Sequence, residues 1–402
     1  MTNLPQGWKM ETLGEILSSD KYSIKRGPFG SALKKSFFVE KGIRIFEQYN
    51  AINNDPHWKR YFISHEKFQE LEAFKATEGD LLISCSGTLG KIVELPKDTE
   101  MGIINQALLK IRLNNIKILN SYFIYYFNSP IMQEKILEST LGSAIKNIAS
   151  VKILKQIEIP LPPLKEQERI VGILDESFAK IDESIKILEQ DLLNLDELMQ
   201  SALQKAFNPL KDNAKENYKL PQSWEWKSLE EISENISAGG DKPKNCTESK
   251  TAKNQIPVYA NGVNNNGLVG YTDKATIIKP SLTISARGTI GFVCIRKEPY
   301  FPIVRLISLI PCENILCLHY LYFCLNFFIA KGEGSSIPQL TIPKFKSLQI
   351  PLPPLKEQEQ IAKHLDFVFE KTKALKELYT KELKDYEELK QSLLNKAFKG
   401  EL

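Results

Sequence analysis

The chain has 402 residues, of which 42% are hydrophobic and 25% are charged, and its formal net charge is +4. This length suits about two to four domains, and the composition is that of a globular protein. Met1–Leu13 lacks a basic segment followed by an apolar one, and the most apolar stretch, residues 315–330, is too short for a bilayer. We therefore expect a cytoplasmic protein with no export signal and no membrane segment.

The charge is unevenly distributed along the chain. Residues 1–160 carry 21 basic and 17 acidic groups, and residues 211–352 carry 17 and 12. Residues 161–210 carry 5 and 10, and residues 353–402 carry 10 of each. Two basic blocks thus alternate with an acidic and a neutral block, which favours nucleic-acid contact by the basic blocks without establishing it.

Each half of the chain opens in the same way. Residues 4–16 and 220–232 share a Leu-Pro-Gln-x-Trp phrase that ends in Leu-x-Glu-Ile. The pattern predicts a short strand around the tryptophan and then a helical turn. The middles that follow, near residues 26–50 and 241–267, diverge. Both are short β-prone runs broken by Gly, Pro and Asn, which predicts strands with turns.

Similarity between the halves returns in two further elements. Residues 81–93 and 282–294 each predict a strand, a Gly-Thr-x-Gly turn and a second strand, because glycine allows a positive φ or a close backbone approach. Residues 121–128 and 319–326 are aromatic stripes at helical spacing. Such a stripe favours a core helix over a ligand site.

One twelve-residue phrase occurs twice. Residues 159–170 and 350–361 read Ile-Pro-Leu-Pro-Pro-Leu-Lys-Glu-Gln-Glu-x-Ile and differ only at Arg169 and Gln360, so the chain is an internal duplication. After the phrase each half predicts one helix of about 44 residues, or roughly 65 Å. The first helix has a regular apolar seam, whereas the second has Lys376 and Lys390 at seam positions.

A seam this long needs a partner, because a lone helix would leave it in water. The other helix is the nearest partner. We prefer an antiparallel pairing over a parallel one, because it gives the duplicated chain a pseudo-two-fold symmetry.

Motifs of enzymes are largely absent. The segment nearest to a phosphate-binding loop, residues 87–92, is too short, and both Pro-Pro pairs follow Leu rather than the Asp or Asn of amino-methyltransferases. Glu-x-Lys fragments at 248–250, 382–384 and 388–390 are as frequent as chance allows. We therefore expect no catalytic residue in this chain.

The cysteines do not indicate a metal site. The six cysteines form no CxxC pair, and a group of Cys312, Cys317, His319 and Cys324 has no familiar zinc spacing. We expect free thiols and no metal.

DNA binding is the class that remains. It needs cations for phosphates, and amide, hydroxyl or guanidinium groups for base edges. For each such residue the alternative is an ordinary surface or turn role, and for the Gly-Thr-x-Gly turns the alternative to phosphate binding is a tight structural turn. The candidates are Lys25, Arg26, Ser31, Lys34, Lys35, Gln48, Tyr49, Asn50, Lys59, Arg60, Ser86, Thr88 and Lys91 in the first half, and Lys242, Lys244, Lys253, Asn254, Tyr259, Asn261, Asn264, Asn265, Arg287 and Thr289 in the second.

Several of these features together resemble a known family. The repeated phrase with its long helix, the Gly-Asp-Leu-Leu-Ile-Ser-Cys-Ser-Gly-Thr-Leu-Gly run (79–90) and the Lys-Ala-Phe-Lys-Gly-Glu-Leu terminus (396–402) resemble the DNA-specificity (S) subunit of type I restriction-modification enzymes. The resemblance covers nearly the whole chain. It implies two target-recognition domains, each recognising one half of a bipartite double-stranded DNA site.

The resemblance also implies partners. The two conserved helices would act as a ruler and dock methyltransferase (M) subunits, two of them, which bind S-adenosylmethionine and methylate adenine. Restriction (R) subunits would cleave DNA with ATP and Mg. No cofactor is expected in this chain. Gln167 and Gln358, polar positions on the helix seams, then predict either a cap or hydrogen bond to the adjoining domain or a contact with an M subunit.

We therefore expect an α+β protein in which two β-rich domains are separated by two long helices that form an antiparallel coiled coil. The expected boundaries are 1–160 for recognition domain 1, 161–210 for the central helix, 211–352 for recognition domain 2 and 353–402 for the C-terminal helix. Two other classes remain open. One is a coiled-coil adaptor without DNA readout, and the other is a system in which a nuclease or methyltransferase is fused to the specificity part.

Overall fold

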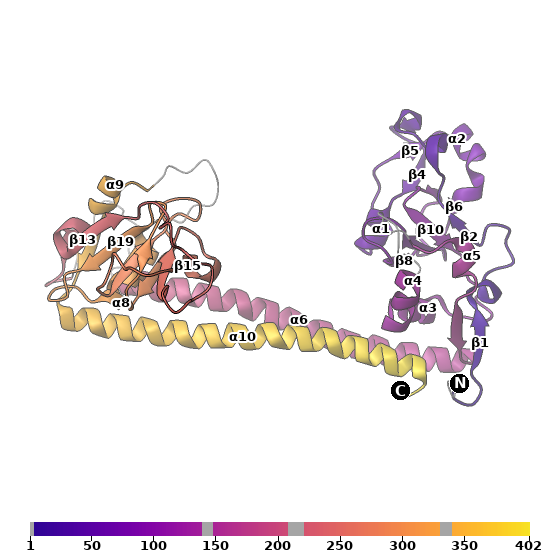
Figure 1. Ribbon diagram of the computed structural model, residues 1–402. Coiled ribbons are helices and arrows are strands. Elements are labelled where there is room, and N and C mark those ends of the chain that lie inside the picture. Colours follow the sequence, from indigo (N-terminus) through magenta and orange to yellow (C-terminus); the bar gives the residue numbers. More distant parts are fainter. Residues whose placement is uncertain (1–3, 139–147, 208–220, 330–339) are drawn as a thin grey trace. The chain divides into compact units, whose positions relative to one another are not determined.

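The computed structural model describes residues 4–138, 148–207, 221–329 and 340–402. The chain forms two compact units (Figure 1). Unit 1 comprises Met1–Leu188 with Lys381–Leu402, and unit 2 comprises Glu189–Thr380. Each unit therefore contains one β-rich domain and parts of both long helices. The domain boundary expected at residues 210 and 211 lies outside the described residues.

The strands of unit 1 are β1 (Lys9–Thr12), β2 (Ile24–Arg26), β3 (Phe38–Val39), β4 (Ile43–Phe46), β5 (Phe62–Ile63), β6 (Lys75–Ala76), β7 (Leu81–Ser84), β8 (Ile92–Glu94), β9 (Gly102–Ile104), β10 (Leu108–Ile111) and β11 (Glu158–Leu161). Its helices are η1 (Leu13–Ile16), η2 (Gly30–Ala32), η3 (Lys35–Phe37), α1 (Gln48–Ile52), α2 (His65–Glu70), η4 (Glu72–Phe74), α3 (Asn120–Asn128), α4 (Pro130–Glu138), α5 (Val151–Leu154) and the first part of α6 (Leu164–Phe207).

Three sheets build the domain of unit 1. An antiparallel sheet has the order β2-β10-β7-β8, and a mixed sheet has the order β3-β5-β4-β9-β6 with β4 and β9 parallel. The opening strand β1 pairs with β11, so that Met10 lies opposite Pro160 of the repeated phrase. The phrase therefore supplies the strand that closes the domain before α6 begins.

Unit 2 repeats this plan with fewer strands. Its strands are β12 (Glu225–Ser228), β13 (Ser233–Ala238), β14 (Ile256–Tyr259), β15 (Leu268–Thr272), β16 (Ser281–Ile284), β17 (Val293–Arg296), β18 (Phe301–Pro302), β19 (Ile307–Pro311) and β20 (Gln349–Leu352). Its helices are α7 (Leu229–Ile232), η5 (Asn264–Gly267), α8 (Leu318–Phe328), α9 (Ile342–Lys346) and the first part of α10 (Leu355–Lys399).

The sheets of unit 2 correspond to those of unit 1. The order β13-β19-β16-β17 matches β2-β10-β7-β8, and β12 pairs with β20 as β1 pairs with β11. A three-stranded sheet, β15-β14-β18, replaces the five-stranded one. The predicted strand with helical turn, the Gly-Thr-x-Gly hairpins and the shared frame of the duplication are all present.

The aromatic helices are core elements, as the sequence predicts. In α3, Tyr122, Phe123, Tyr126 and Phe127 are buried, since their spacing places them on one face. The corresponding stripe of α8 is buried as well. Each of these helices also packs against the end of a long helix: Phe398 of α10 lies 5.4 Å from the Tyr122 ring, and Phe207 of α6 lies 5.6 Å from the Tyr320 ring, between centroids.

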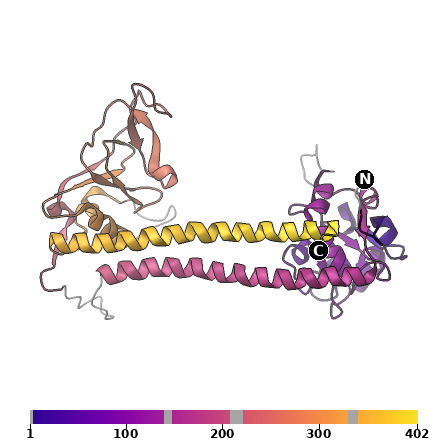
Figure 2. The same cartoon turned by 90° about the horizontal axis from the view of Figure 1, so that it is seen from below.

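The two long helices pair in antiparallel fashion, and α6 and α10 lie side by side in both views (Figures 1 and 2). Within unit 1, Lys390 forms an ion pair with Asp182, and within unit 2, Lys376 forms an ion pair with Asp196. Along α6 the position rises by 14 (196 − 182) while along α10 it falls by 14 (390 − 376). The two lysines that interrupt the second seam thus have acidic partners on the first helix.

Neither the long helices nor the shorter helices among the described residues contain a stretch apolar enough to cross a bilayer.

Candidate nucleic-acid interface

Both domains form the same turn between the strands of the Gly-Thr-x-Gly hairpin. In unit 1 the Gly90 N–H donates to Ser84 O at 3.0 Å, and in unit 2 the Gly291 N–H donates to Ser285 O at 3.0 Å. Gly90 has a φ of +69° and Gly291 one of +82°, conformations that favour glycine. Turn geometry alone therefore explains these glycines.

The variable middle of each domain packs against this turn. In unit 1 the Ser86 hydroxyl donates to Gln48 Oε1 of α1 at 3.4 Å. In unit 2 the Ala286 N–H donates to Asn261 Oδ1 at 2.8 Å, and the Gly262 N–H donates to Ser285 Oγ at 3.3 Å. The amide side chain that follows β4 in unit 1, and the one that follows β14 in unit 2, thus contact the shared hairpin turn.

A third loop joins them through a close backbone contact. The Gly27 N–H donates to Leu108 O at 2.9 Å, and the Gly239 N–H donates to Leu306 O at 2.8 Å. A Cβ on Gly27 would lie 1.8 Å from Asn105 O, and one on Gly239 would lie 2.6 Å from a backbone atom of Ile303. Only glycine permits this approach.

Three loops and one connection therefore meet at one place in each domain. We call these places loop edge 1 (residues 26–31, 46–50, 85–91 and 105–107) and loop edge 2 (residues 238–244, 259–262, 285–291 and 303–306). The ranges of loop edge 1 contain the predicted Arg26, Ser31, Gln48, Tyr49, Ser86, Thr88 and Lys91, and those of loop edge 2 contain Lys242, Lys244, Tyr259, Asn261, Arg287 and Thr289.

Other candidates lie elsewhere on the domains. Lys34 and Lys35 are exposed at η3, and Lys25 lies in β2 with its ammonium 5.2 Å from the Phe74 ring centroid. Lys59 pairs with Glu100 at 2.6 Å, and Arg60 lies over the Tyr61 ring. In unit 2, Lys253 is exposed in the loop before β14, and Asn264 and Asn265 belong to η5.

Two predicted DNA contacts need correction. Asn50 is fully buried, and its amide donates to Asp55 O at 2.8 Å and Trp58 O at 2.9 Å. Asn254 is buried, and its amide donates to Asn245 O at 2.7 Å. Each buried amide is held by neighbouring groups of the chain, so neither side chain is exposed to a base edge.

Two buried arginines that the sequence analysis missed support the variable segments. Arg44 is 1% exposed and donates from Nη2 to Pro56 O at 2.9 Å and Trp58 O at 2.7 Å; burial lowers the pKa of its guanidinium. Arg296 lies 3.5 Å from the Tyr259 ring centroid and donates from Nε to Thr283 Oγ1 at 3.0 Å. The sequence contained one signal for these residues: each arginine stands in an otherwise apolar strand, Arg44 in β4 and Arg296 at the end of β17.

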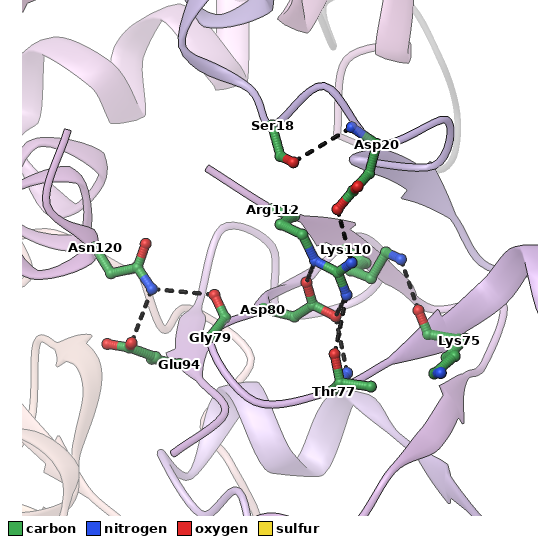
Figure 3. Close-up of polar contacts among 10 residues, drawn as sticks. All are labelled: Ser18, Asp20, Lys75, Thr77, Gly79, Asp80, Glu94, Lys110, Arg112 and Asn120. Atoms are coloured by element: carbon green, nitrogen blue, oxygen red, sulfur yellow. Dashed lines mark hydrogen bonds and ion pairs between the residues drawn. The ribbon is translucent and has the colours of Figure 1, made fainter. Parts of the chain in front are cut away.

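A network of ion pairs and hydrogen bonds surrounds Asp80, the residue before the hairpin strand β7 of unit 1 (Figure 3). The fully buried Asp80 carboxylate accepts from Arg112 Nε at 2.7 Å and Nη2 at 2.9 Å, a bidentate pair. Hydrogen bonds to Asp80 and Asp20 raise the pKa of Arg112. Lys110 donates to Lys75 O at 2.6 Å, and burial lowers the pKa of its ammonium. The network positions β7 and β10, whose ends carry loop edge 1.

The joint between each domain and its helix is the same in both units. Gln167 is fully buried, accepts from Leu119 N at 2.9 Å and donates to Lys117 O and Pro162 O, each at 2.9 Å. Gln358 repeats the pattern with Cys317 N, Ile315 O and Pro353 O. Of the two expectations for these glutamines, hydrogen bonding to the adjoining domain is correct, because no amide group is left exposed for an M subunit.

The thiol cluster considered as a zinc site is not assembled. Within the described residues, no group of three His, Cys, Asp or Glu side chains is placed to hold a metal ion. Cys324 is fully buried in α8, and His319 Nδ1 lies 2.8 Å from Asp366 Oδ2.

Comparisons with known proteins agree on one family. A model of the type I restriction modification DNA specificity domain matches residues 5–192 and again residues 221–385. A putative type I specificity subunit of Mycoplasma pneumoniae is 33% identical over 221 residues, which are 54% of this chain and about half (56%) of that relative's length. The putative type I restriction enzyme MjaX specificity subunit of Methanocaldococcus jannaschii is 25% identical over 362 residues, 85% of this chain and 82% of that relative.

A solved structure shows the same fold. A chain from a study of complex assembly and conformational transition of the type I R-M system superposes with a TM-score of 0.81. The superposition covers 100% of both chains at 21% sequence identity.

Proposed function

The chain belongs to the type I restriction-modification DNA specificity family, and from this we propose that it is the subunit that selects the DNA site of a type I complex. Recognition domain 1 contacts one half of a bipartite site through loop edge 1. Recognition domain 2 contacts the other half through loop edge 2. The observation that carries the proposal is that the two domains share the hairpin turn and the close glycine contact but carry different side chains around them.

The composition of the loop edges supports contact with DNA. Loop edge 1 presents Arg26 and Lys91 for phosphates and Gln48 for a base edge, and loop edge 2 presents Lys242 and Arg287 with amide-bearing neighbours. Tyr49 is 44% exposed although its ring stacks on Trp58 at 4.4 Å between centroids. An exposed rigid aromatic beside cations suits a nucleic-acid surface better than a solvated loop.

Methyl transfer and cleavage belong to partner subunits in this proposal. M subunits bind S-adenosylmethionine and methylate adenine, and R subunits cleave DNA with ATP and Mg. The helices dock the M subunits. Exposed leucines support such docking within unit 2: Leu193 and Leu198 on α6 are 59% and 52% exposed, and Leu378 on α10 is 49% exposed.

The helices also set the distance between the half-sites. Each has 44 or 45 residues, which corresponds to roughly 65 Å at ~1.5 Å per residue. At ~3.4 Å per base pair this length limits the separation to roughly two DNA turns. Removing one heptad from both helices changes the number of base pairs between the methylated half-sites.

The test is to co-express the chain with its M subunits and to map methylated adenines in genomic DNA. The proposal predicts one asymmetric bipartite motif and no methyl transfer by the purified chain alone. A complex whose DNA binding is absent or insensitive to salt would support an adaptor role instead. Turnover by the isolated chain would contradict the non-catalytic assignment.

Docking has its own test. The double variant Leu193→Lys with Leu198→Lys places charge at two exposed apolar positions of α6, and we expect at least ~10-fold weaker M-subunit binding. Glu189→Lys, an exposed position on the same helix, is the matched control for added charge. Equal M-subunit affinity for both variants would remove Leu193 and Leu198 from the docking surface.

A further inference from the structure

The connection between β18 and β19 holds two residues in a conformation that their side chains disfavour. Val304 and Arg305 have φ values of +54° and +58°. In this left-handed region Cβ crowds the backbone, and a β-branched residue is an outlier. Consecutive positive φ values usually fall on Asn-Gly or Gly-Gly. In the same domain Asn265 and Asn266, a residue type enriched in this region, have φ values of +47° and +53°. Turn propensity therefore does not explain the Val-Arg pair.

Loop edge 2 holds this turn rigidly by its backbone. The Val304 N–H donates to Gly240 O at 2.8 Å, and the Arg305 N–H donates to Gly239 O at 2.8 Å. The Asn261 side-chain amide donates to Val304 O at 2.6 Å. Strain of this kind persists only where the surroundings over-determine it, and it concentrates at ligand contacts. The side chains themselves are exposed, Val304 to 49%.

The corresponding turn in domain 1 is relaxed. Ile284 lies opposite Ile307 as Ile83 lies opposite Leu109, so the sheet registers align Val304 with Gln106 and Arg305 with Ala107. Gln106 is exposed, and neither it nor Ala107 has a positive φ. The same place in the frame thus carries Gln-Ala without strain in one domain and Val-Arg with strain in the other.

We propose that the Val304–Arg305 turn is a base-recognition element of domain 2, in which the Arg305 guanidinium donates to O6 and N7 of a guanine in that half-site. The paired donors of arginine match this base edge in the major groove. Within the described residues the Arg305 guanidinium makes no hydrogen bond or ion pair. Lys242 and Arg287 add positive charge on the same loop edge, against one acidic neighbour, Asp241. A rigid turn fixes the direction in which the Arg305 side chain leaves the backbone.

This inference rests on the proposed function, and its test uses the complex with M subunits. Methylated adenines are mapped, and methylation rates are measured on duplexes that vary one base pair at a time. For Arg305→Ala we expect the rate at the wild-type site to fall about 10- to 100-fold. We also expect one guanine position of the domain 2 half-site to lose its selectivity, with the other half-site unchanged. Lys297→Ala, an exposed cation outside loop edge 2, is the matched control and leaves rate and motif as in the wild type.

A second variant separates recognition from folding. Val304→Asn with Arg305→Gly supplies residues that suit two positive φ values. We expect the melting temperature to rise and the guanine selectivity to be lost. A merely structural turn would gain stability and keep its selectivity, which would overturn the inference.

Two further outcomes are decisive. A uniform loss of rate at every sequence, with a shallower salt dependence, would assign Arg305 to a phosphate and overturn the base contact. A wild-type complex that methylates no DNA would instead refute the proposed function itself. Loss of selectivity at one guanine in an otherwise active complex supports the inference.

Discussion

The two recognition domains share a backbone frame but stabilise it by different chemistry. Immediately before the hairpin strand β7, unit 1 has Asp80, whose buried carboxylate pairs with Arg112. The corresponding residue of unit 2 is Ser281, the first residue of β16, and its hydroxyl lies 2.9 Å from the Tyr300 hydroxyl. An ion network in one domain thus corresponds to a neutral hydrogen bond in the other. Because the hairpin turn makes the same backbone hydrogen bond in both domains, the frame does not depend on either chemistry.

Two kinds of feature are the same in both domains: close contacts between backbone segments, and glutamine side chains that hydrogen-bond to backbone groups. Gly27 and Gly239 make the same close approach, and Gln167 and Gln358 make the same three hydrogen bonds. Side chains can diverge on such a frame without changing where the loops lie. This freedom is what two domains need if each recognises a different sequence.

The largest expected effect breaks the ion network. Asp80→Ala leaves Arg112 and Lys110 without their buried counter-charge, and we expect a loss of about 3 kcal/mol in the free energy of unfolding of unit 1. Ser281→Ala in unit 2 removes one neutral hydrogen bond and costs about 1 kcal/mol. Urea denaturation of both variants measures the difference, and equal losses would contradict the distinction between the two domains.

The second-largest expected effect concerns the close backbone contacts that Gly27 and Gly239 make in the two domains. Gly27→Ala or Gly239→Ala forces backbone apart, and each should destabilise its unit by about 2–3 kcal/mol and lower DNA affinity by displacing a loop. Gly172→Ala in α6 is the control, since a Cβ there meets nothing within 4 Å; it should be neutral or stabilising by up to about 1 kcal/mol. If the two loop variants behaved like the helix control, the close approach would not matter.

The joints should respond alike in both units. Gln167→Ala and Gln358→Ala each leave buried backbone groups without partners, at a cost of about 2 kcal/mol in the free energy of unfolding. Thermal denaturation of the two single variants provides the measurement. Destabilisation by only one of the two substitutions would show that the repeated hydrogen bonds contribute unequally to the stability of the two units.

The smallest effect concerns the coiled coil. Lys376→Ala and Lys390→Ala each remove an exposed ion pair between α6 and α10, and we expect a loss of no more than about 0.5 kcal/mol, reduced further by salt. Unfolding at low and high salt checks this. A loss above about 2 kcal/mol would mean that these pairs stabilise the helix pair rather than fix its register.

The sequence predicts the parts of this protein that depend on repetition and periodicity. The duplicated phrase and the long apolar seam led to the two helices, and the Gly-Thr-x-Gly spacing led to the hairpins. The lysines on the second seam looked like defects because their partners, Asp182 and Asp196, lie on the other helix, far away in the chain. Pairing across a helix interface is not visible in one helix's own pattern.

The candidate site was predicted only in part, for a different reason. Polar residues in a variable loop look alike in sequence, whether they face solvent or hold the loop together. Asn50 and Asn261 both follow a short strand, yet Asn50 is buried in α1 and holds the backbone that follows this helix, whereas Asn261 contacts the hairpin turn. Val304 and Arg305 carry no turn signal at all, so only the backbone conformation identifies them. Long-range backbone hydrogen bonds decide such cases.

The most direct test of the account is to replace recognition domain 2, residues 211–352, with a second copy of domain 1 and to map the methylated adenines made with the M subunits. If each domain recognises its own half-site through its own loop edge, the asymmetric motif becomes symmetric, with two copies of the half recognised by domain 1. Retention of the original asymmetric motif would contradict the account.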